Sequence, residues 1–330
     1  MVKYILKRIL LSVFILFGVS LITYFLIRLM PTDYIDNKYA AQIANGSVTM
    51  EQVHEIKTIY GIDDNSFGGI IKGYFSWLGN TLQGNLGISF KYTRPVGTVI
   101  AENMWISFWM ALVAFVLQTV VAIPLGVTCA THQYSKRDYT LTVATLALIS
   151  LPSFFLSALL IKVFAVDLGW FPVQGLVDAS VVHATPISEW GDKIHHLLLP
   201  MLTTLLLSIG GFLRYTRTNT LEVLRADYIR TARAKGLQES VVIGKHAFRN
   251  TLIPIVTMMA GILPGLFGGM MILERVFAIP GIGYMSYEAL MNGDVPFIMG
   301  YVMFVSVLSV IGTLFSDLMY SVVDPRVKLT

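Results

Sequence analysis

Charge is scarce in this chain, and the shortage decides its class. Only 13% of its 330 residues are Asp, Glu, Lys or Arg, whereas 55% are hydrophobic. A soluble domain carries about 25% charged residues, because charged side chains cover its water-facing surface. The deficit therefore excludes an ordinary soluble protein and predicts an integral membrane protein.

The chain has only one cysteine, and it lacks the motifs of common catalytic sites. The single cysteine, Cys129, excludes an internal disulfide and a cysteine-based metal cluster, and its apolar neighbours predict a small buried side chain. The sequence has no phosphate loop G-x-x-x-x-G-K-[ST], no H-E-x-x-H and no G-x-S-x-G. The adjacent His195 and His196 point in two directions on a helix, which suits one metal ion poorly. We therefore expect a non-catalytic chain that binds neither a metal nor a cofactor.

What the sequence does have is uncharged apolar runs long enough to cross a bilayer. A helix needs about 20 apolar residues to span the hydrocarbon core. Such runs occur at Ile9–Ile27, Met104–Ala130, Tyr139–Ile161, Leu197–Leu213, Thr251–Leu273 and Val295–Ser316. The first run exceeds the usual signal-peptide core of about 7–15 residues, so we interpret residues 1–30 as a retained first transmembrane helix. The expected fold is all-α, with about six transmembrane helices.

The distribution of Lys and Arg predicts the orientation. If the N-terminus is cytoplasmic, the cytoplasmic segments hold nearly twice as many basic residues as the outer ones, over much less chain. Both termini and residues 214–250 are then cytoplasmic. Residues 31–103 form an extracytoplasmic segment, and residues 104–330 form a core with the other helices. Lys162 and Asp317 fall near helix ends, where they can reach water. None of the six runs has a mid-membrane carboxylate, which counts against ion-coupled transport.

A compact basic insert, RTARAKGLQESVVIGKHAFRN (residues 230–250), separates the fourth and fifth runs. It predicts two helices joined at Gly236, because glycine takes a left-handed cap at no steric cost. The apolar faces would consist of Leu221, Leu224, Tyr228 and Ala232 in the first helix and Leu237, Val241 and Phe248 in the second. Such a pair could rest on anionic lipid or dock on a protein. The small residues Ala232, Ala234 and Gly236 favour docking, because they let a partner's backbone come close.

Prolines and glycines interrupt several runs, most densely the fifth. Lipid cannot satisfy the backbone groups that they free, so such helices either line a cavity or pack closely on other helices. The residues alone leave both interpretations open. The candidates for lining a pathway are Gln118, Pro152, Thr257 and Pro264.

Four stretches of the chain resemble one known family. Residues 222–254 resemble the EAA region of ABC importer permeases, and DYIRTARAKG (227–236) is similar to its form in the B-type subunit of oligopeptide and dipeptide permeases. The other stretches are WLGNTLQGNLGISFKYTRPV (77–96), ERVFAIPGIG (274–283) and VDPRVKL (323–329). They occur in the family's order and span nearly the whole chain. Departures from the general family pattern occur at Asn85, Arg230 and Arg249.

The resemblance implies a type I importer fold and one half of a heterodimeric permease in a bacterial or archaeal cell membrane. Its partners would be a second permease, two ATPase subunits that use ATP and Mg²⁺, and an external substrate-binding protein. The ATPase-coupling residues would be Ala232, Arg233, Ala234, Lys235, Gly236 and Leu237. An outer gate would contain Pro280, Gly281 and Gly283.

The resemblance also implies a cargo, which would be peptides. Nickel chelates, glutathione, murein peptides and oligosaccharides are alternative cargoes of similar permeases. A stand-alone secondary transporter or channel and a membrane enzyme are the competing classes. The absence of a mid-membrane carboxylate and of catalytic motifs counts against both.

Overall fold

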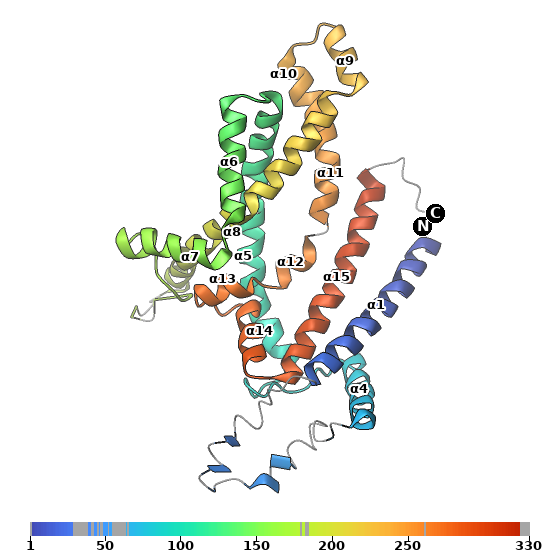
Figure 1. Cartoon of the computed structure of the whole chain (residues 1–330), viewed down its shortest axis with the longest axis vertical. Helices are drawn as coiled ribbons and strands as arrows, with labels where there is room; N and C mark the ends of the chain where they lie inside the picture. Colours follow the sequence, from blue (N-terminus) through green and yellow to red (C-terminus); the bar gives the residue numbers. More distant parts are fainter. Residues whose placement is uncertain are drawn as a thin grey trace.

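The regular elements in the described part of the chain are all helices (Figure 1). A computed structural model describes residues 2–28, 39–40, 43–44, 46, 49–51, 53–54, 64, 66–178, 180–181, 185–260 and 262–323. Its elements are α1 (Val2–Arg28), α4 (Phe67–Leu82), α5 (Val96–Thr131), α6 (Lys136–Ser150), α7 (Ser153–Leu160), η1 (Ile161–Asp167), α8 (Pro186–Leu224), α9 (Asp227–Ala234), α10 (Glu239–Val241), η2 (Val242–Ala247), α11 (Phe248–Ala260), α12 (Leu263–Phe267), α13 (Met271–Val276), α14 (Ile282–Met291) and α15 (Val295–Val323). Elements η1 and η2 are π-helical turns. An isolated antiparallel bridge joins Ile88 to Pro95.

Four helices in the described residues are long and apolar enough to cross a membrane, fewer than the expected six. They are Leu6–Leu26, Val96–Thr131, Pro186–Leu224 and Val295–Asp317. A fifth crossing is possible if the pair Lys136–Ser150 and Ser153–Asp167, bent by 104°, counts as one span. The bend follows from Pro152, because proline disfavours helical backbone at the residue before it. Leu151 is accordingly extended, with φ −82° and ψ 134°.

The fifth apolar run, Thr251–Leu273, is not one helix. It is divided among α11, α12 and α13, and the longest of these, α11, has 13 residues against the roughly 20 that a span needs. The break before α13 falls at Gly269, whose φ of +76° lies in the left-handed region that favours glycine. The span expected over this run, with its prolines and glycines, is therefore three shorter helices in the structure.

Helices α5, α6 and α8 are held together by close backbone approaches. A side chain at Gly126 of α5 would meet the Cβ of Thr216 at 2.7 Å and the Leu213 carbonyl at 2.8 Å. Gly210 of α8 lies equally close to Thr145 of α6. Small residues at helix crossings allow such contact inside a membrane. Cys129 is fully buried beside this crossing, as the sequence predicts.

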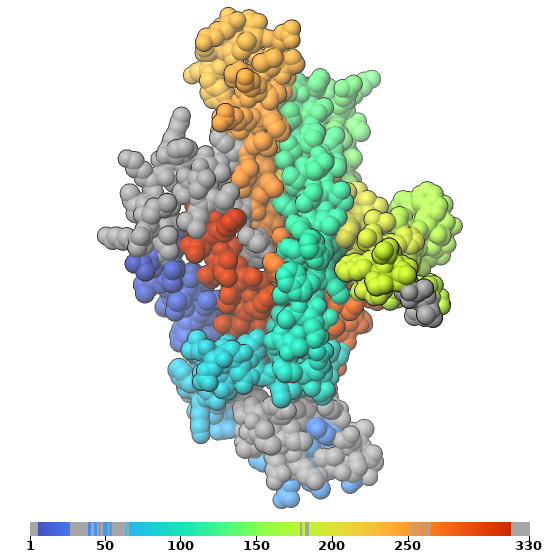
Figure 2. All heavy atoms as spheres, turned by 180° about the vertical axis from the view of Figure 1, so that it is seen from behind, coloured from blue at the N-terminus to red at the C-terminus, as the bar shows by residue number. Residues whose placement is uncertain are grey.

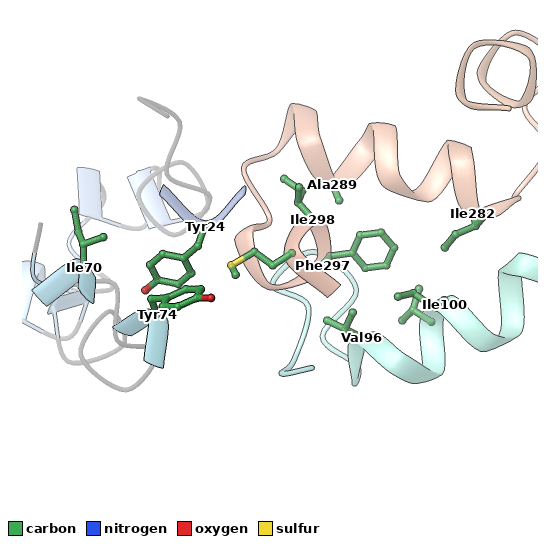
Figure 3. Packing of buried hydrophobic residues seen from close by; sticks show 11 residues of the cluster. Tyr24, Ile70, Tyr74, Val96, Ile100, Ile282, Ala289, Phe297 and Ile298 are labelled. Carbon is green, nitrogen blue, oxygen red and sulfur yellow. The ribbon is translucent and has the colours of Figure 1, made fainter. Parts of the chain in front are cut away.

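At the other end of the molecule, α1 and α4 meet the beginning of α5 and α15 in a second core (Figure 3). The rings of Tyr24 and Tyr74 meet edge to face, with centroids 5.5 Å apart. The hydroxyl groups of Tyr74 and Ser20 are 2.9 Å apart and form a buried hydrogen bond. Phe297 is fully buried in the same cluster.

The two ionisable residues predicted near helix ends have partners. Asp317 of α15 forms an ion pair with Arg8 of α1, with Nε and Oδ2 3.1 Å apart. Lys162 pairs with Asp167 at an exposed position, with 2.5 Å between the charged atoms. The Arg8–Asp317 pair joins the first and last helices of the chain.

Candidate functional site

The basic insert forms a protruding elbow, which we define as residues 225–247 and call the α9–α10 elbow. Figure 1 places α9 and α10 at one extreme of the molecule, beyond the long helices, and Figure 2 shows the same protrusion from behind. Helix α8 ends at Leu224, α9 runs to Ala234, and the chain then reverses through Gly236, whose φ is +75°. The predicted arrangement of helix, glycine turn and helix is therefore confirmed.

The elbow has its own small core, which differs in part from the predicted faces. Its buried residues are Ile229, Ala232, Val242 and Ala247, packed on Val223 and Leu224. Tyr228, which we expected on the apolar face, is instead 48% exposed. The break between α8 and α9 causes this difference, because it rotates the second segment relative to the first.

The second half of the elbow shows a similar shift. Leu237 and Val241, predicted to be apolar-face residues, are 40% and 38% exposed, whereas Val242 is fully buried. Leu237 lies in the connection before α10, and Val241 is the last residue of α10, directly before the π-helical turn η2. Two apolar side chains thus remain at the surface of the elbow.

The six proposed coupling residues do not all face outward. Ala232 is buried in the elbow's core, whereas Ala234, Lys235, Gly236 and Leu237 are exposed. A Cβ at Gly236 would meet no atom within 4 Å. The space beside the exposed corner at Gly236 is therefore not filled by this chain.

Arg233 has a partner within the elbow. Its Nε and Nη2 atoms donate hydrogen bonds to the two carboxylate oxygens of Glu239, at 3.1 and 2.6 Å. The hydrogen-bonded guanidinium holds the pKa of Glu239 below its ordinary value. The pair thus joins α9 to α10 across the glycine turn.

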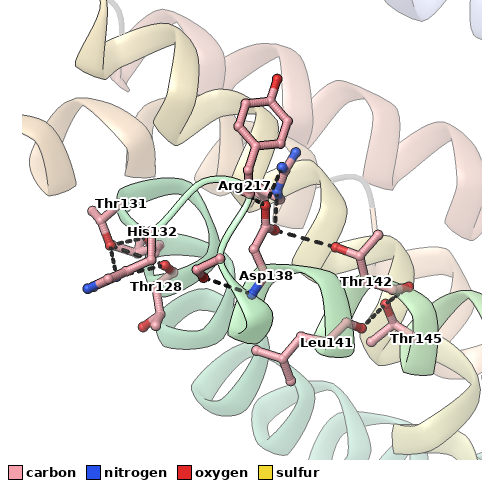
Figure 4. Close-up of polar contacts among 11 residues, drawn as sticks. Thr128, Thr131, His132, Asp138, Leu141, Thr142, Thr145 and Arg217 are labelled. Atoms are coloured by element: carbon pink, nitrogen blue, oxygen red, sulfur yellow. Dashed lines mark hydrogen bonds and ion pairs between the residues drawn. The ribbon is translucent and has the colours of Figure 1, made fainter.

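A buried ion pair anchors α8 ahead of the elbow. Arg217 of α8 donates two hydrogen bonds to Asp138 of α6, Nε to Oδ1 and Nη2 to Oδ2, both at 2.7 Å (Figure 4). The side chain of Asp138 is only 5% exposed. Asp138 also accepts a hydrogen bond from the backbone N–H of Tyr134, and its own N–H donates to Ser135. The α5–α6 turn and the helix leading to the elbow are thereby joined.

We expect Asp138→Ala to lower the free energy of unfolding by about 3 kcal/mol, because it leaves the Arg217 guanidinium without its buried partner. Thermal unfolding of Asp138→Ala, Arg217→Ala and the double variant forms a double-mutant cycle. The free energy of unfolding should fall less in the double variant than the sum of its decreases in the two single variants, because the second substitution removes the unpaired charge. Simple additivity of the three values would show that the pair is not coupled.

A second polar cluster lies at the bend between α12 and α14, which we define as residues 268–283 and call the outer bend. Its centre is Glu274, which is fully buried. One carboxylate oxygen accepts hydrogen bonds from the Ser107 hydroxyl at 2.7 Å and the Met270 N–H at 2.8 Å. The other oxygen accepts from the Tyr284 N–H at 2.8 Å. One carboxylate therefore connects α5, α13 and α14.

The proposed gate residues surround this carboxylate. Pro280 and Gly281 immediately precede α14, and Gly283 lies in its first turn. A Cβ at Gly281 would lie 2.5 Å from both Glu274 Oε2 and Ser107 Oγ. A Cβ at Gly283 would lie 2.7 Å from the Met271 backbone nitrogen. Glycine is required at both positions because any side chain would displace this packing.

Asp294 forms a comparable centre beyond α14. Its carboxylate accepts hydrogen bonds from the Ser89 hydroxyl at 2.5 Å and from the N–H groups of Phe90 and Lys91 at 3.1 and 3.0 Å. It also accepts from the N–H of Phe297 in the first turn of α15. The WLGNTLQGNLGISFKYTRPV stretch is thereby tied to the beginning of the last helix.

The pathway candidates lie on three different parts of the bundle. Gln118 is in α5 and only 9% exposed, and Pro152 stands at the bend between α6 and α7. Thr257 is in α11 and Pro264 in α12, but their side chains lie outside the described part of the structure. Their role as pathway residues stays a prediction. Among the described residues, no group of three or more His, Cys, Asp or Glu side chains is arranged to hold a metal ion.

The sequence did not predict that Asp138, Glu274 and Asp294 would be buried carboxylates that each bind several hydrogen-bond donors. Glu274 was noted only as the first residue of ERVFAIPGIG. The local signal for Asp138 was its place three residues after a serine that caps a helix. Asp294 follows a glycine at the end of an apolar helix, which gives no comparable signal.

Two family descriptions match the chain. The model described as "Binding-protein-dependent transport system inner membrane component" matches residues 122–329, and the corresponding N-terminal model matches residues 1–111. The chain belongs to this family. It is a permease component of binding-protein-dependent (ABC) transport, a non-catalytic subunit of the inner membrane, as the resemblance implies. Such a system includes a binding protein and ATPase partners.

Curated relatives of this permease match it over their full length. It is 35% identical over 329 residues to the oligopeptide transport system permease protein AppB of Bacillus subtilis, covering 99% of this chain and 100% of the relative. It is 34% identical over 328 residues to a putative peptide transport system permease protein of Brucella abortus, with 99% of both chains covered. The dipeptide transport system permease protein DppB of Lactococcus lactis is 32% identical over 330 residues, with 100% of both chains covered.

Proposed function

We propose that this permease is one half of a heterodimeric pathway that imports peptides, either dipeptides or oligopeptides. The observation that carries the proposal is similarity along the full chain to relatives named as oligopeptide and dipeptide permeases. The partners would be a second, homologous permease, two ATP-binding subunits and an extracytoplasmic substrate-binding protein. The binding protein would set most of the selectivity for cargo.

The proposed topology is that of a type I importer with six crossings and both termini in the cytoplasm. The broken run α11–α13 and the bent pair α6–α7 would each make one crossing, supported from within the protein because lipid cannot satisfy their free backbone groups. Helix α1 begins and α15 ends toward the end of the molecule that carries the elbow, which supports this orientation (Figure 1). Residues 1–30 would be the first span, residues 31–103 an external segment and residues 104–330 the permease core.

The α9–α10 elbow would couple the spans to the ATPases. Its exposed corner, with Gly236 and the apolar Leu237, would seat in a cleft on an ATPase subunit. Closure of the ATPase pair on ATP would move the elbow as a rigid body and bias the spans between inward-open and outward-open states. The Arg233–Glu239 pair supports rigid movement, because it braces the corner internally.

The outer bend and the external segment would form the opposite end of the pathway. Pro280, Gly281 and Gly283 would shape a gate at the outer mouth, and residues 31–103 would receive the binding protein. Most of residues 31–65 and the tail residues 324–330 lie outside the described residues.

Uptake into vesicles tests the function. The permease, reconstituted with its partner permease, both ATPases and the binding protein, should accumulate a labelled dipeptide or pentapeptide when ATP is present. A non-hydrolysable ATP analogue is the control and should give no accumulation. Competition by a nickel chelate, glutathione, a murein peptide or an oligosaccharide compares the other cargoes. Accumulation of one of these compounds without peptide uptake would reject peptides as the cargo. Uptake driven by an ion gradient in the absence of the ATPases would reject coupling to ATP hydrolysis.

A further inference from the structure

A recess between α5 and α6 has no role in the function proposed above. It has a volume of about 420 Å³ and is lined by Leu125, Thr128, Lys136, Arg137, Thr140 and Leu141. We call it the α5–α6 recess. We propose that it binds one anionic phospholipid of the cytoplasmic leaflet, an inference that rests on the proposed topology.

The cations of the recess are available for a phosphate. Lys136 and Arg137 occupy the first turn of α6 and are both exposed. Within the described part of the chain, neither forms an ion pair with a carboxylate. The N-terminus of a helix adds partial positive charge from its free N–H groups. Two cations beside a helix start therefore favour an anionic headgroup at this point.

The wall of the recess suits the apolar part of the same molecule. Leu125 of α5 and Leu141 of α6 contribute aliphatic side chains from its two sides. The Thr128 hydroxyl already donates a hydrogen bond to the Pro124 carbonyl at 2.8 Å, so it needs no water. A free phosphate ion would leave this apolar wall uncovered, whereas the first part of an acyl chain would cover it. Basic pockets between transmembrane helices on the cytoplasmic side are known to hold lipid headgroups.

The position of α6 explains why the recess exists. Asp138, next to the two cations in sequence, faces the other way and is bound to Arg217 of α8 (Figure 4). Gly210 brings α8 close to α6 at a second point. Helix α6 is thus held against α8, and a gap remains on its α5 side. Figure 1 shows α6 at the outer edge of the bundle, with its first turn toward the end of the molecule that carries the elbow.

Two exposed aromatic residues flank the recess in sequence. Tyr134 is 87% exposed and has a φ of 63°, and Tyr139 is 72% exposed. Tyrosine is enriched at the membrane–water interface, where its ring lies at headgroup level. The turn and the first residues of α6 therefore have the composition of an interfacial segment.

Lipid retention by the whole purified importer complex tests the site. The complex is loaded with phosphatidylglycerol in detergent, washed, and analysed for bound lipid by native mass spectrometry. The double variant Lys136→Gln/Arg137→Gln should retain at least about tenfold less phosphatidylglycerol than the natural chain. Each base near an anionic lipid contributes several-fold to binding. The matched control is Lys3→Gln with Lys7→Gln, which removes the same charge from another basic segment proposed to lie at the cytoplasmic leaflet. If the recess itself holds the lipid, this control should retain it within about twofold of the natural chain, which separates a defined site from general basic charge.

Three further measurements complete the test. Excess inorganic phosphate should not displace the lipid. If it does, the recess is a site for free anions only and the proposal is wrong. Equal retention by the double variant and the control would overturn the proposal, as would equal retention of phosphatidylcholine and phosphatidylglycerol. Unchanged thermal unfolding of the double variant would show that lost retention does not reflect lost folding. Because no transport is measured, failure of the peptide proposal would leave this result unaffected.

Discussion

Replacing Gly236 by tryptophan or valine is expected to reduce ATP-driven uptake at least about tenfold while the helices remain folded. Gly236 has a φ of +75°, a conformation that costs other residues roughly 1–2 kcal/mol and β-branched residues more. A Cβ at Gly236 meets no atom of this chain within 4 Å, so a tryptophan side chain there would start in the open space proposed for the ATPase. Uptake and ATP hydrolysis are measured in the same vesicles, and hydrolysis should exceed what uptake accounts for.

Gly236→Asn is the matched control for this experiment. Asparagine tolerates the left-handed conformation better than other side chains, and it adds less bulk than tryptophan. It should retain most of the uptake. If Gly236→Trp transports as well as the natural chain, the elbow does not dock on an ATPase at this corner.

Replacing Glu274 by alanine is expected to lower the free energy of unfolding by about 3–5 kcal/mol and to abolish uptake. Three donors, from Ser107, Met270 and Tyr284, would lose their acceptor in a site closed to water, at about 1–3 kcal/mol each before relaxation. Glu274→Gln should be intermediate. Its amide oxygen can still accept two of the bonds, but its NH₂ group would oppose the third donor. Thermal unfolding of the purified complex measures both variants.

Glu288 provides a control of the same chemistry at a partly exposed position. Its carboxylate pairs with Lys91 and Arg275, and its side chain is 20% exposed. The hydrogen bond from Lys91, with the charges of Lys91 and Arg275, keeps the pKa of Glu288 below its ordinary value. Glu288→Gln should cost about 1 kcal/mol, because the pair keeps some contact with water and the amide oxygen can still accept a hydrogen bond from Lys91. Equal effects at positions 274 and 288 would contradict the role given to Glu274.

The sequence was most informative where a single local pattern decides the structure. Uncharged runs predicted the long helices, because a bilayer demands apolar length. Gly236 predicted the corner of the elbow, because its position after a basic helix requires a left-handed residue. These features depend on neighbours in the chain, so periodicity and residue type were sufficient.

Helix breaks were harder to predict, because proline and glycine permit a break without dictating it. Pro152 bends the third run by 104°, whereas Pro124 and Pro200 lie inside the continuous helices α5 and α8. The difference lies in the surrounding protein, which must satisfy the backbone groups that a break would free. The break at Arg225 and the π-helical turn η2 have no comparable sequence signal.

The partners of the three buried carboxylates could not be predicted from the sequence for a different reason. Asp138 binds a residue 79 positions away, Glu274 binds Ser107 across 167 positions, and Asp294 binds Ser89 across 205. Such pairs leave no periodic pattern, and a carboxylate near the end of a helix looks solvated until the fold buries it. The proposed coupling and pathway residues remain predictions, because contacts with partner subunits decide them.

The length of α8 determines how far a small tilt of this helix moves its ends. Its 39 residues form one continuous helix, which at 1.5 Å per residue is about 58 Å long. A tilt of only about 5° about one end would carry the other end about 5 Å, close to the rise of one helical turn. The tight crossings at Gly126 and Gly210 would carry α5 and α6 along with it. In the mechanism proposed above, opening one mouth and sealing the other would therefore need only small rotations of stiff helices, without unfolding any helix.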